Sequence, residues 1–170
     1  VDVDTNGNGS PDLIGASLDA ISFSIDKSAA QSVTLDVTDV ANLSLTGDLA
    51  FARIIPNGIS DSRYSAFRMG NVEVSGSLND AFKTQINLGA TADVTVTQLN
   101  LNQVNGNFSR LDWTNAFDRD GDGNSDTLTF ENGLSIDFAS TLHHELEGSV
   151  DSLELTADTV TLTGSGGFSL

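Results

Sequence analysis

The chain is 170 residues long, which is enough for one domain with a hydrophobic core. Its apolar content is 38% and its aromatic content 6%, so a thin β-architecture fits better than a thick globular core. The 24 Asp and Glu residues outnumber the 7 Lys and Arg residues, which gives a formal net charge of -17. Such a charge repels nucleic acid and anionic lipid, so neither is an expected partner.

The lack of cysteine excludes disulfides, thiolate metal sites and cysteine nucleophiles. No apolar run approaches the roughly 20 residues that a membrane helix needs, so membrane insertion is not expected. The chain begins inside a polar motif and ends inside a strand-like pattern, which is typical of a piece of a longer protein.

Apolar and polar residues alternate along most of the chain. In chain order, the alternating runs cover Ile21–Ile25, Val33–Val37, Leu43–Phe51, Val72–Leu78, Val94–Leu101 and Leu153–Leu162. A period of two residues predicts strands that bury one face, and the intervening Thr, Ser, Asn and Asp side chains suit a solvated face. No stretch shows the period of an α-helix, and the sequence allows only a short helix of one or two turns, at Asp80–Lys83 or Thr114–Phe117.

The alternation slips by one residue at several points, for example between Val96 and Leu99 and between Ala157 and Val160. One extra residue in a strand is typical of a β-bulge or of a tight corner between short strands. We therefore expect an all-β fold, an elongated antiparallel β-sheet or sandwich with bulges. Regular corners would instead build a β-solenoid, which is the alternative.

Residues 1–170 are expected to form a single β-rich segment with an internal repeat. Residues 1–53 and 118–170 each contain an acidic Gly/Asn loop, then a strand, then a Leu-Thr-Gly step that leads to a phenylalanine. Such echoes are typical of tandem arrays, in which each copy is stabilised by its neighbours. Acidic turns and Leu-Thr-Gly steps are also common in unrelated β-proteins, so coincidence is the alternative.

The strongest site motif is the nine-residue loop 118–126, which holds four aspartates. Calcium takes about six to eight oxygen ligands, and alternate residues of a flexible loop can turn their carboxylates toward one centre. The expected Ca²⁺ ligands are the carboxylates of Asp118, Asp120, Asp122 and Asp126 and the backbone carbonyl of Asn124. Thr129 stands where an EF-hand places its closing glutamate, so Asp112, Glu131 or a more distant carboxylate would have to complete the ligand set.

A second loop, residues 4–12, follows the same template with fewer charges. Its expected ligands are Asp4, Asn6, Asn8, Ser10 and Asp12. Two of these side chains are neutral amides, so calcium affinity is expected to be weaker here. The alternative is an Asx-rich turn that is stabilised by its own side chains.

Catalytic motifs are nearly absent from the sequence, so the chain is not expected to be an enzyme. His143-His144-Glu145 lacks the spacing of a His-Glu-x-x-His zinc site, and neighbouring residues of a strand point to opposite faces. Trp113 is expected to anchor the acidic loop in the core, with a sugar-stacking platform as the alternative.

The Asp-rich loops resemble those of thrombospondin type 3 repeats and of bacterial surface adhesins. With its alternating Thr/Ser/Asp strands and no cysteine, the whole chain resembles repeat units of giant bacterial extracellular proteins. It departs from the RTX calcium roll, because the Gly-Gly-x-Gly-x-Asp nonapeptide is missing. The resemblance implies a structural or adhesive repeat of a secreted cell-surface or filament protein, rigidified by calcium.

The resemblance also implies an extracellular location and partners that are copies of the chain, neighbouring repeats or surface polysaccharide. End-to-end contact is expected, because the segments Val1–Asp4 and Leu162–Leu170 resemble edge strands that invite pairing. The alternative function is a carbohydrate- or ligand-binding β-module of a secreted multidomain protein. Its candidate aromatic site consists of Tyr64, Phe67 and Trp113.

Overall fold

The structure is a computed structural model, and it describes the chain except for residues 26–32, 38–39, 120–121, 123 and 158. The elements, in chain order, are β1 (Ser17–Ile25), β2 (Val33–Val37), β3 (Ala41–Ile55), β4 (Tyr64–Leu78), α1 (Asp80–Ile86), β5 (Gly89–Val104), β6 (Leu128–Thr129), β7 (Ser135–Ile136), β8 (His144–Ala157) and β9 (Val160–Ser169). This order confirms the predicted all-β fold. The short helix α1 includes the segment Asp80–Lys83, for which the sequence left room.

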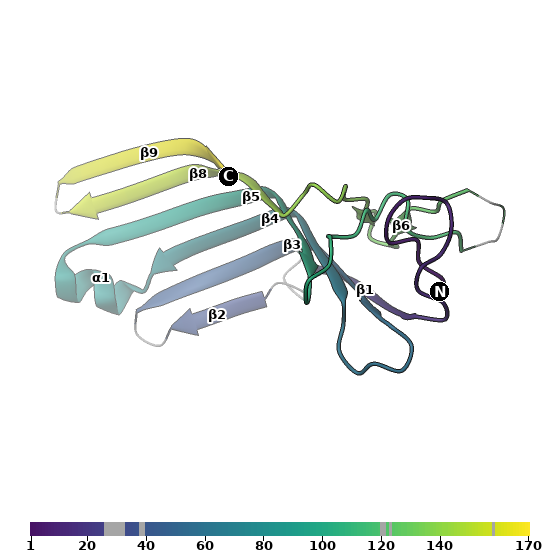
Figure 1. Ribbon diagram of the computed structural model, residues 1–170. Coiled ribbons are helices and arrows are strands. Elements are labelled where there is room, and N and C mark those ends of the chain that lie inside the picture. Colours follow the sequence, from purple (N-terminus) through teal and green to yellow (C-terminus); the bar gives the residue numbers. More distant parts are fainter. Residues whose placement is uncertain (26–32, 38–39, 120–121, 123, 158) are drawn as a thin grey trace. The chain divides into compact units, whose positions relative to one another are not determined.

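Seven strands form one antiparallel sheet (Figure 1). Its order is β1-β3-β4-β5-β8-β9, and β2 pairs with the first residues of β3. The short strands β6 and β7 form a separate two-stranded sheet. The described strands therefore confirm the expected antiparallel sheet, and they do not form the solenoid that was the alternative.

The hairpin of β8 and β9 contains one bulge and one tight corner. The register between the two strands shifts between Val150 and Leu153, as in a bulge. The slip at Ala157–Val160 is a corner, because these two residues pair with each other at the turn of the hairpin. Both kinds of irregularity that the sequence predicted therefore occur in this hairpin.

The expected inward-facing series of β3 is wrong. The alternation predicted that Leu49 and Phe51 continue the inward-facing series, but the structure buries Ala50 and Ala52 instead. Gly47 has a φ of 136°, which residues with a Cβ rarely adopt. Thr46, directly before this glycine, is buried as well, so the buried residues of β3 are even-numbered on both sides of Gly47.

The chain forms two compact units, and each is made from three separate stretches. The first comprises Val1–Phe23, Leu49–Arg68 and Leu99–Glu145, and the second comprises Ser24–Asp48, Met69–Gln98 and Leu146–Leu170. Five strands contribute residues to both units, namely β1, β3, β4, β5 and β8. Neither unit coincides with one half of the predicted internal repeat, which stays a prediction.

The buried hydrophobic cluster of the described residues belongs entirely to the first unit. The sheet contributes alternate residues of β3 to this cluster, namely Ala50, Ala52 and Ile54. The largest side chains come from the irregular stretch after β5, where the rings of Trp113 and Phe117 lie 5.7 Å apart. Small residues on the strands thus leave space for large side chains that cover one face of the sheet.

One buried asparagine on β5 holds this covering stretch in place. Asn102 is fully buried, and its Nδ2 donates to the carbonyl oxygens of Leu111 at 2.9 Å and Ala139 at 3.2 Å. Its Oδ1 accepts a hydrogen bond from Nε1 of Trp113 at 3.1 Å. The amide therefore pairs with the buried carbonyl of Leu111 and the buried indole N–H, which would otherwise be costly to remove from water, and with the partly buried carbonyl of Ala139.

We expect Asn102→Ala to lower the free energy of unfolding by about 3 kcal/mol, because it leaves two carbonyls and the indole N–H without partners. Asn105→Ala, at an exposed position just after β5, is the control and should change stability by less than about 0.5 kcal/mol. Urea denaturation followed by tryptophan fluorescence measures both. Equal effects of the two variants would contradict the role of Asn102.

Candidate functional site

The loop of residues 4–12 is closed by a buried residue at its base. Val3 is fully buried and forms an antiparallel bridge with Leu13. The carbonyl oxygen of Val3 also accepts a hydrogen bond from the backbone N–H of Asp12 at 2.8 Å. The core therefore fixes both ends of the loop, while the residues between them lie at the surface.

The carboxylate of Asp4 organises the backbone inside this loop. Its two oxygens accept hydrogen bonds from the backbone N–H groups of Asn6 at 3.1 Å, Gly7 at 2.7 Å and Gly9 at 2.7 Å. Desolvation tends to raise the pKa of Asp4. The backbone amides of Gly9, Asn6, Gly7 and Asn8 together outweigh this effect, so the pKa lies below its ordinary value of 3.8. The carboxylate is thus held in its charged form.

The other expected ligands of this loop take part in the same network. Asn6 accepts from the N–H of Asn8 and Asn8 accepts from the N–H of Ser10, each through its Oδ1. Asp12 accepts from the N–H and Oγ1 of Thr5 and from Nδ2 of Asn6. The structure brings the five predicted residues into one loop, with the turn geometry that the Asx-rich alternative also predicts.

The second loop, residues 118–126, repeats this closure at corresponding positions. The carbonyl of Phe117 accepts from the N–H of Asp126 at 2.6 Å, as Val3 does from Asp12. The Oδ2 of Asp126 accepts from the N–H of Arg119 at 2.6 Å, as Asp12 does from Thr5. A third bond matches in the same way, because Asp122 Oδ1 accepts from the N–H of Asn124 at 2.7 Å, as Asn8 does from Ser10.

The described part of the second loop leaves out one predicted ligand. Asp120 lies outside the described residues, whereas Asp118, Asp122, Asn124 and Asp126 lie inside them. The backbone and side chain of Asn124 donate hydrogen bonds that lower the pKa of Asp122. The described residues contain no cluster of three or more His, Cys, Asp or Glu side chains that could hold a metal ion. Calcium ligation therefore stays a prediction.

The two loops lie side by side, which sequence reasoning did not predict. The backbone N–H of Asp4 donates to the carbonyl of Ala116 at 3.0 Å. Val3 and Phe117, the residues that precede the two loops, both belong to the buried cluster of the first unit. The signal in the sequence was an apolar residue directly before each acidic loop.

Asp112 was one candidate for completing the ligand set of the second loop. Its carboxylate accepts hydrogen bonds from the N–H and Oγ1 of Thr114 and from Nδ2 of Asn115. It thereby shapes the turn that follows Trp113. Asp112 is therefore engaged locally, upstream of the loop.

The two histidine rings lie together at the surface, although neighbouring residues of a strand point to opposite faces. The Nδ1 atoms of His143 and His144 lie 3.2 Å apart and the ring centroids 4.8 Å apart. The strand β8 begins at His144, so His143 lies outside the strand and is not bound by its alternation. Both side chains are exposed.

The candidate aromatic site is not an exposed platform. Trp113 is fully buried and Tyr64 is 3% exposed, so neither ring can stack on a sugar at the surface. The interpretation of Trp113 as a core residue is confirmed. Phe108 is exposed, but the guanidinium of Arg63 covers its ring at 4.2 Å.

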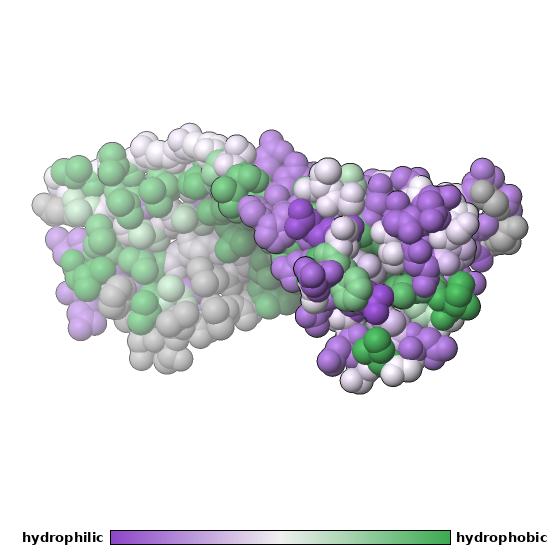
Figure 2. Space-filling model, in the orientation of Figure 1, coloured by the Kyte–Doolittle hydropathy of each residue, from purple (hydrophilic) through white to green (hydrophobic). Residues whose placement is uncertain are grey.

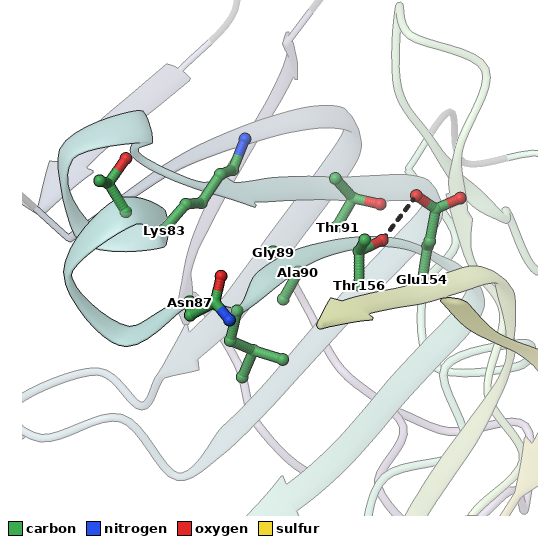
Figure 3. Close-up of a pocket in the computed structure, with 9 residues that line it drawn as sticks. Lys83, Asn87, Gly89, Ala90, Thr91, Glu154 and Thr156 are labelled. Atoms are coloured by element: carbon green, nitrogen blue, oxygen red, sulfur yellow. Dashed lines mark hydrogen bonds between the residues drawn. The ribbon is translucent and has the colours of Figure 1, made fainter. Parts of the chain in front are cut away.

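The second unit has an open hollow of about 550 Å³ between α1, β5 and β8 (Figure 3). Lys83 and Glu154 are its charged residues, and Lys83 already pairs with Asp80 at 3.2 Å. The hydroxyl of Thr156 donates to Glu154 over a long 3.4 Å, which does not activate it as a nucleophile. We assign no chemistry to this hollow.

Comparison with known proteins adds no identification. No family model, curated protein or solved structure matches the chain. Among the described residues, no helix has the length and apolar character needed to cross a membrane.

The hydrogen bonds to Asp4 predict a pH dependence of stability in the presence of a chelator. The folded-state pKa is depressed, so the ionised carboxylate contributes fully above the ordinary value of 3.8, and this contribution is lost as the pH falls through the lower folded-state value. Asp4→Asn should therefore lower the melting temperature at pH 7, and the difference from wild type should vanish at lower pH. Asp61→Asn, an exposed carboxylate in another loop, should show no such difference. A constant gap across the pH range would contradict the assignment.

Proposed function

We propose that the chain is a structural or adhesive β-module of a secreted cell-surface or filament protein, and that its two acidic loops bind Ca²⁺ and stiffen it. The observation that carries this proposal is the matched closure of loops 4–12 and 118–126. Two loops far apart in the sequence share three hydrogen bonds at corresponding positions and lie side by side. A shared backbone geometry built around carboxylates supports a shared ligand.

The hydrogen bonds inside the loops are compatible with a bound cation. Each carboxylate oxygen has more than one acceptor direction, so an oxygen of Asp4 that accepts an N–H can still ligate Ca²⁺. The depressed pKa of Asp4 keeps this oxygen charged. The neutral Asn6 and Asn8 favour a weak site, in the range of about 10⁻⁴–10⁻³ M that is typical of extracellular modules.

Charge supports the same function. The formal net charge of -17 destabilises a compact chain through self-repulsion, and a divalent cation in each loop would reduce it. The chain has no cysteine, so no disulfide can join the loop segments. Calcium would supply that connection, because a ligand that binds only the folded state stabilises it.

Self-association through strand edges is part of the proposal, with one correction. β9 is at the end of the sheet order, so its outer edge can accept another strand. The start of the chain is not available for such pairing, because Val3 is buried against Leu13 and the amino group of Val1 donates to the carbonyl of Ala16 at 2.7 Å. In the candidate aromatic site for carbohydrate binding, Trp113 and Tyr64 are buried, which favours the structural or adhesive function over the binding module.

We expect removal of calcium with a chelator to lower the melting temperature of the wild-type chain by about 5–10 °C. This estimate applies to a starting Ca²⁺ concentration of about one hundred times the Kd of the site. Asp120→Ala with Asp122→Ala should remove most of this shift, because these changes delete two expected carboxylate ligands. Calorimetric titration should show a corresponding loss of one binding event.

The matched control is Asp61→Ala with Glu147→Ala, which removes the same two negative charges from exposed positions outside both loops. It should keep the full chelator response. The proposal that the two loops bind Ca²⁺ is wrong if the wild-type chain shows no heat of binding and no change in melting temperature at millimolar Ca²⁺.

A further inference from the structure

The sheet of the second unit has one apolar face. In the β8–β9 hairpin, Leu155 pairs with Leu162 and Ala157 pairs with Val160, so these four side chains share a face. A hollow of about 220 Å³ on this side continues the face across Leu153, Val94, Val74 and Ala41. We define the apolar face as Val33, Ala41, Leu45, Val74, Leu78, Ala92, Val94, Leu153, Leu155, Ala157, Val160 and Leu162.

Five residues of this face are exposed, namely Val33, Leu153, Ala157, Val160 and Leu162, and the other seven are half-buried. Leu162 is 63% exposed and Val160 is 67% exposed, and the buried cluster of the described residues lies entirely in the first unit. Figure 2 shows hydrophobic side chains gathered over the strands of the second unit. An antiparallel sheet with one apolar face normally packs that face against another layer.

The charges of these strands lie on the opposite face. Glu73 and Asp93 alternate along β4 and β5 with residues of the apolar face. Asp151, at the bulge of β8, lines one hollow together with them and accepts a hydrogen bond from Oγ1 of Thr95. No residue of the apolar face carries a charge. Two such faces can therefore approach without bringing carboxylates together, even though each chain has a net charge of -17.

The size of the apolar face matches what a stable pair needs. Six strands contribute most of the sheet in the second unit, namely β2, β3, β4, β5, β8 and β9, and β1 adds only its last two residues. At about 4.8 Å between strands and about seven residues of 3.4 Å along each, the face measures roughly 29 by 24 Å, or about 700 Å². A standard protein interface buries about 800 Å² on each partner.

We propose that two copies of this chain pack face to face through the apolar face, giving a two-layer β-sandwich shared between them. A second copy supplies the flat, uncharged and pleated surface that this face fits, with the sheets about 10 Å apart. A lipid surface fits less well, because the carboxylates around and behind the face are repelled by anionic headgroups. The contact is distinct from the strand edge of β9 and does not require calcium.

The test compares charges placed on the two faces of the same strand. Val160→Lys with Leu162→Lys puts two ammonium groups into the proposed contact, where they would lose their water. Thr161→Lys with Thr163→Lys adds the same charges to the other face of β9 and is the matched control. A milder pair, Val160→Thr with Leu162→Thr, keeps residues that favour strands and guards against loss of folding.

Sedimentation equilibrium in chelator measures the mass, and circular dichroism checks that each variant is folded. The wild type and the Thr161/Thr163 control should have twice the mass of the 17.8-kDa chain, and both Val160/Leu162 variants should show a two-fold lower mass. A monomeric wild type in the micromolar range would overturn the proposal. So would a wild-type mass that the Val160/Leu162 variants leave unchanged, or binding to neutral lipid vesicles in place of pairing.

Because the chain has no cysteine, single-cysteine variants give an independent check. Leu162→Cys should cross-link between copies with a short bismaleimide, whereas Thr163→Cys, on the opposite face, should not. Cross-linking of Thr163→Cys alone would place the contact on the polar face and overturn the proposal.

Discussion

Apolar and polar residues alternate along the strands, so each part of the sheet has an apolar face that must be removed from water. The rest of this structure depends on what covers that face in each unit. In the first unit, the irregular stretch after β5 covers the alanines of β3 with the side chains of Trp113 and Phe117. Burial of these large rings is the main favourable contribution there. In the second unit, the described residues provide no such layer.

A covering stretch without regular secondary structure has many backbone polar groups to satisfy. Asn102, a residue of the sheet, provides hydrogen-bond partners for two of these groups, the carbonyls of Leu111 and Ala139, and for the indole N–H of Trp113. Arg68 on β4 acts similarly, because its guanidinium donates to the carbonyl of Ser135 and pairs with Asp137 at 2.7 Å. Polar side chains of the sheet thus fix the position of an otherwise irregular layer.

The acidic loops depend on the same core. Val3 and Phe117 insert at their bases, and the loops contact each other through Asp4 and Ala116. Core packing therefore fixes where each loop begins and ends, while carboxylates such as Asp4 organise the exposed turns. A cation bound there would stabilise the first unit, and a second copy would pack on the apolar face of the second unit. Calcium binding by the loops and pairing of two copies through the apolar face concern different surfaces, and different measurements test them.

Local patterns in the sequence were sufficient for the β-class, the strands and an irregularity at Ala157–Val160, because each depends on neighbouring residues, but they left open whether that irregularity was a bulge or a corner. Other features depended on contacts between distant residues. The burial of Ala50 and Ala52 in place of Leu49 and Phe51 depends on which face the covering stretch packs against, and the approach of His143 to His144 reflects where β8 begins. The pairing of the loops through Asp4 and Ala116 joins segments more than a hundred residues apart. Periodicity says that a face is apolar, but only tertiary structure decides which faces are covered, because covering requires a layer from elsewhere in the chain or from another molecule.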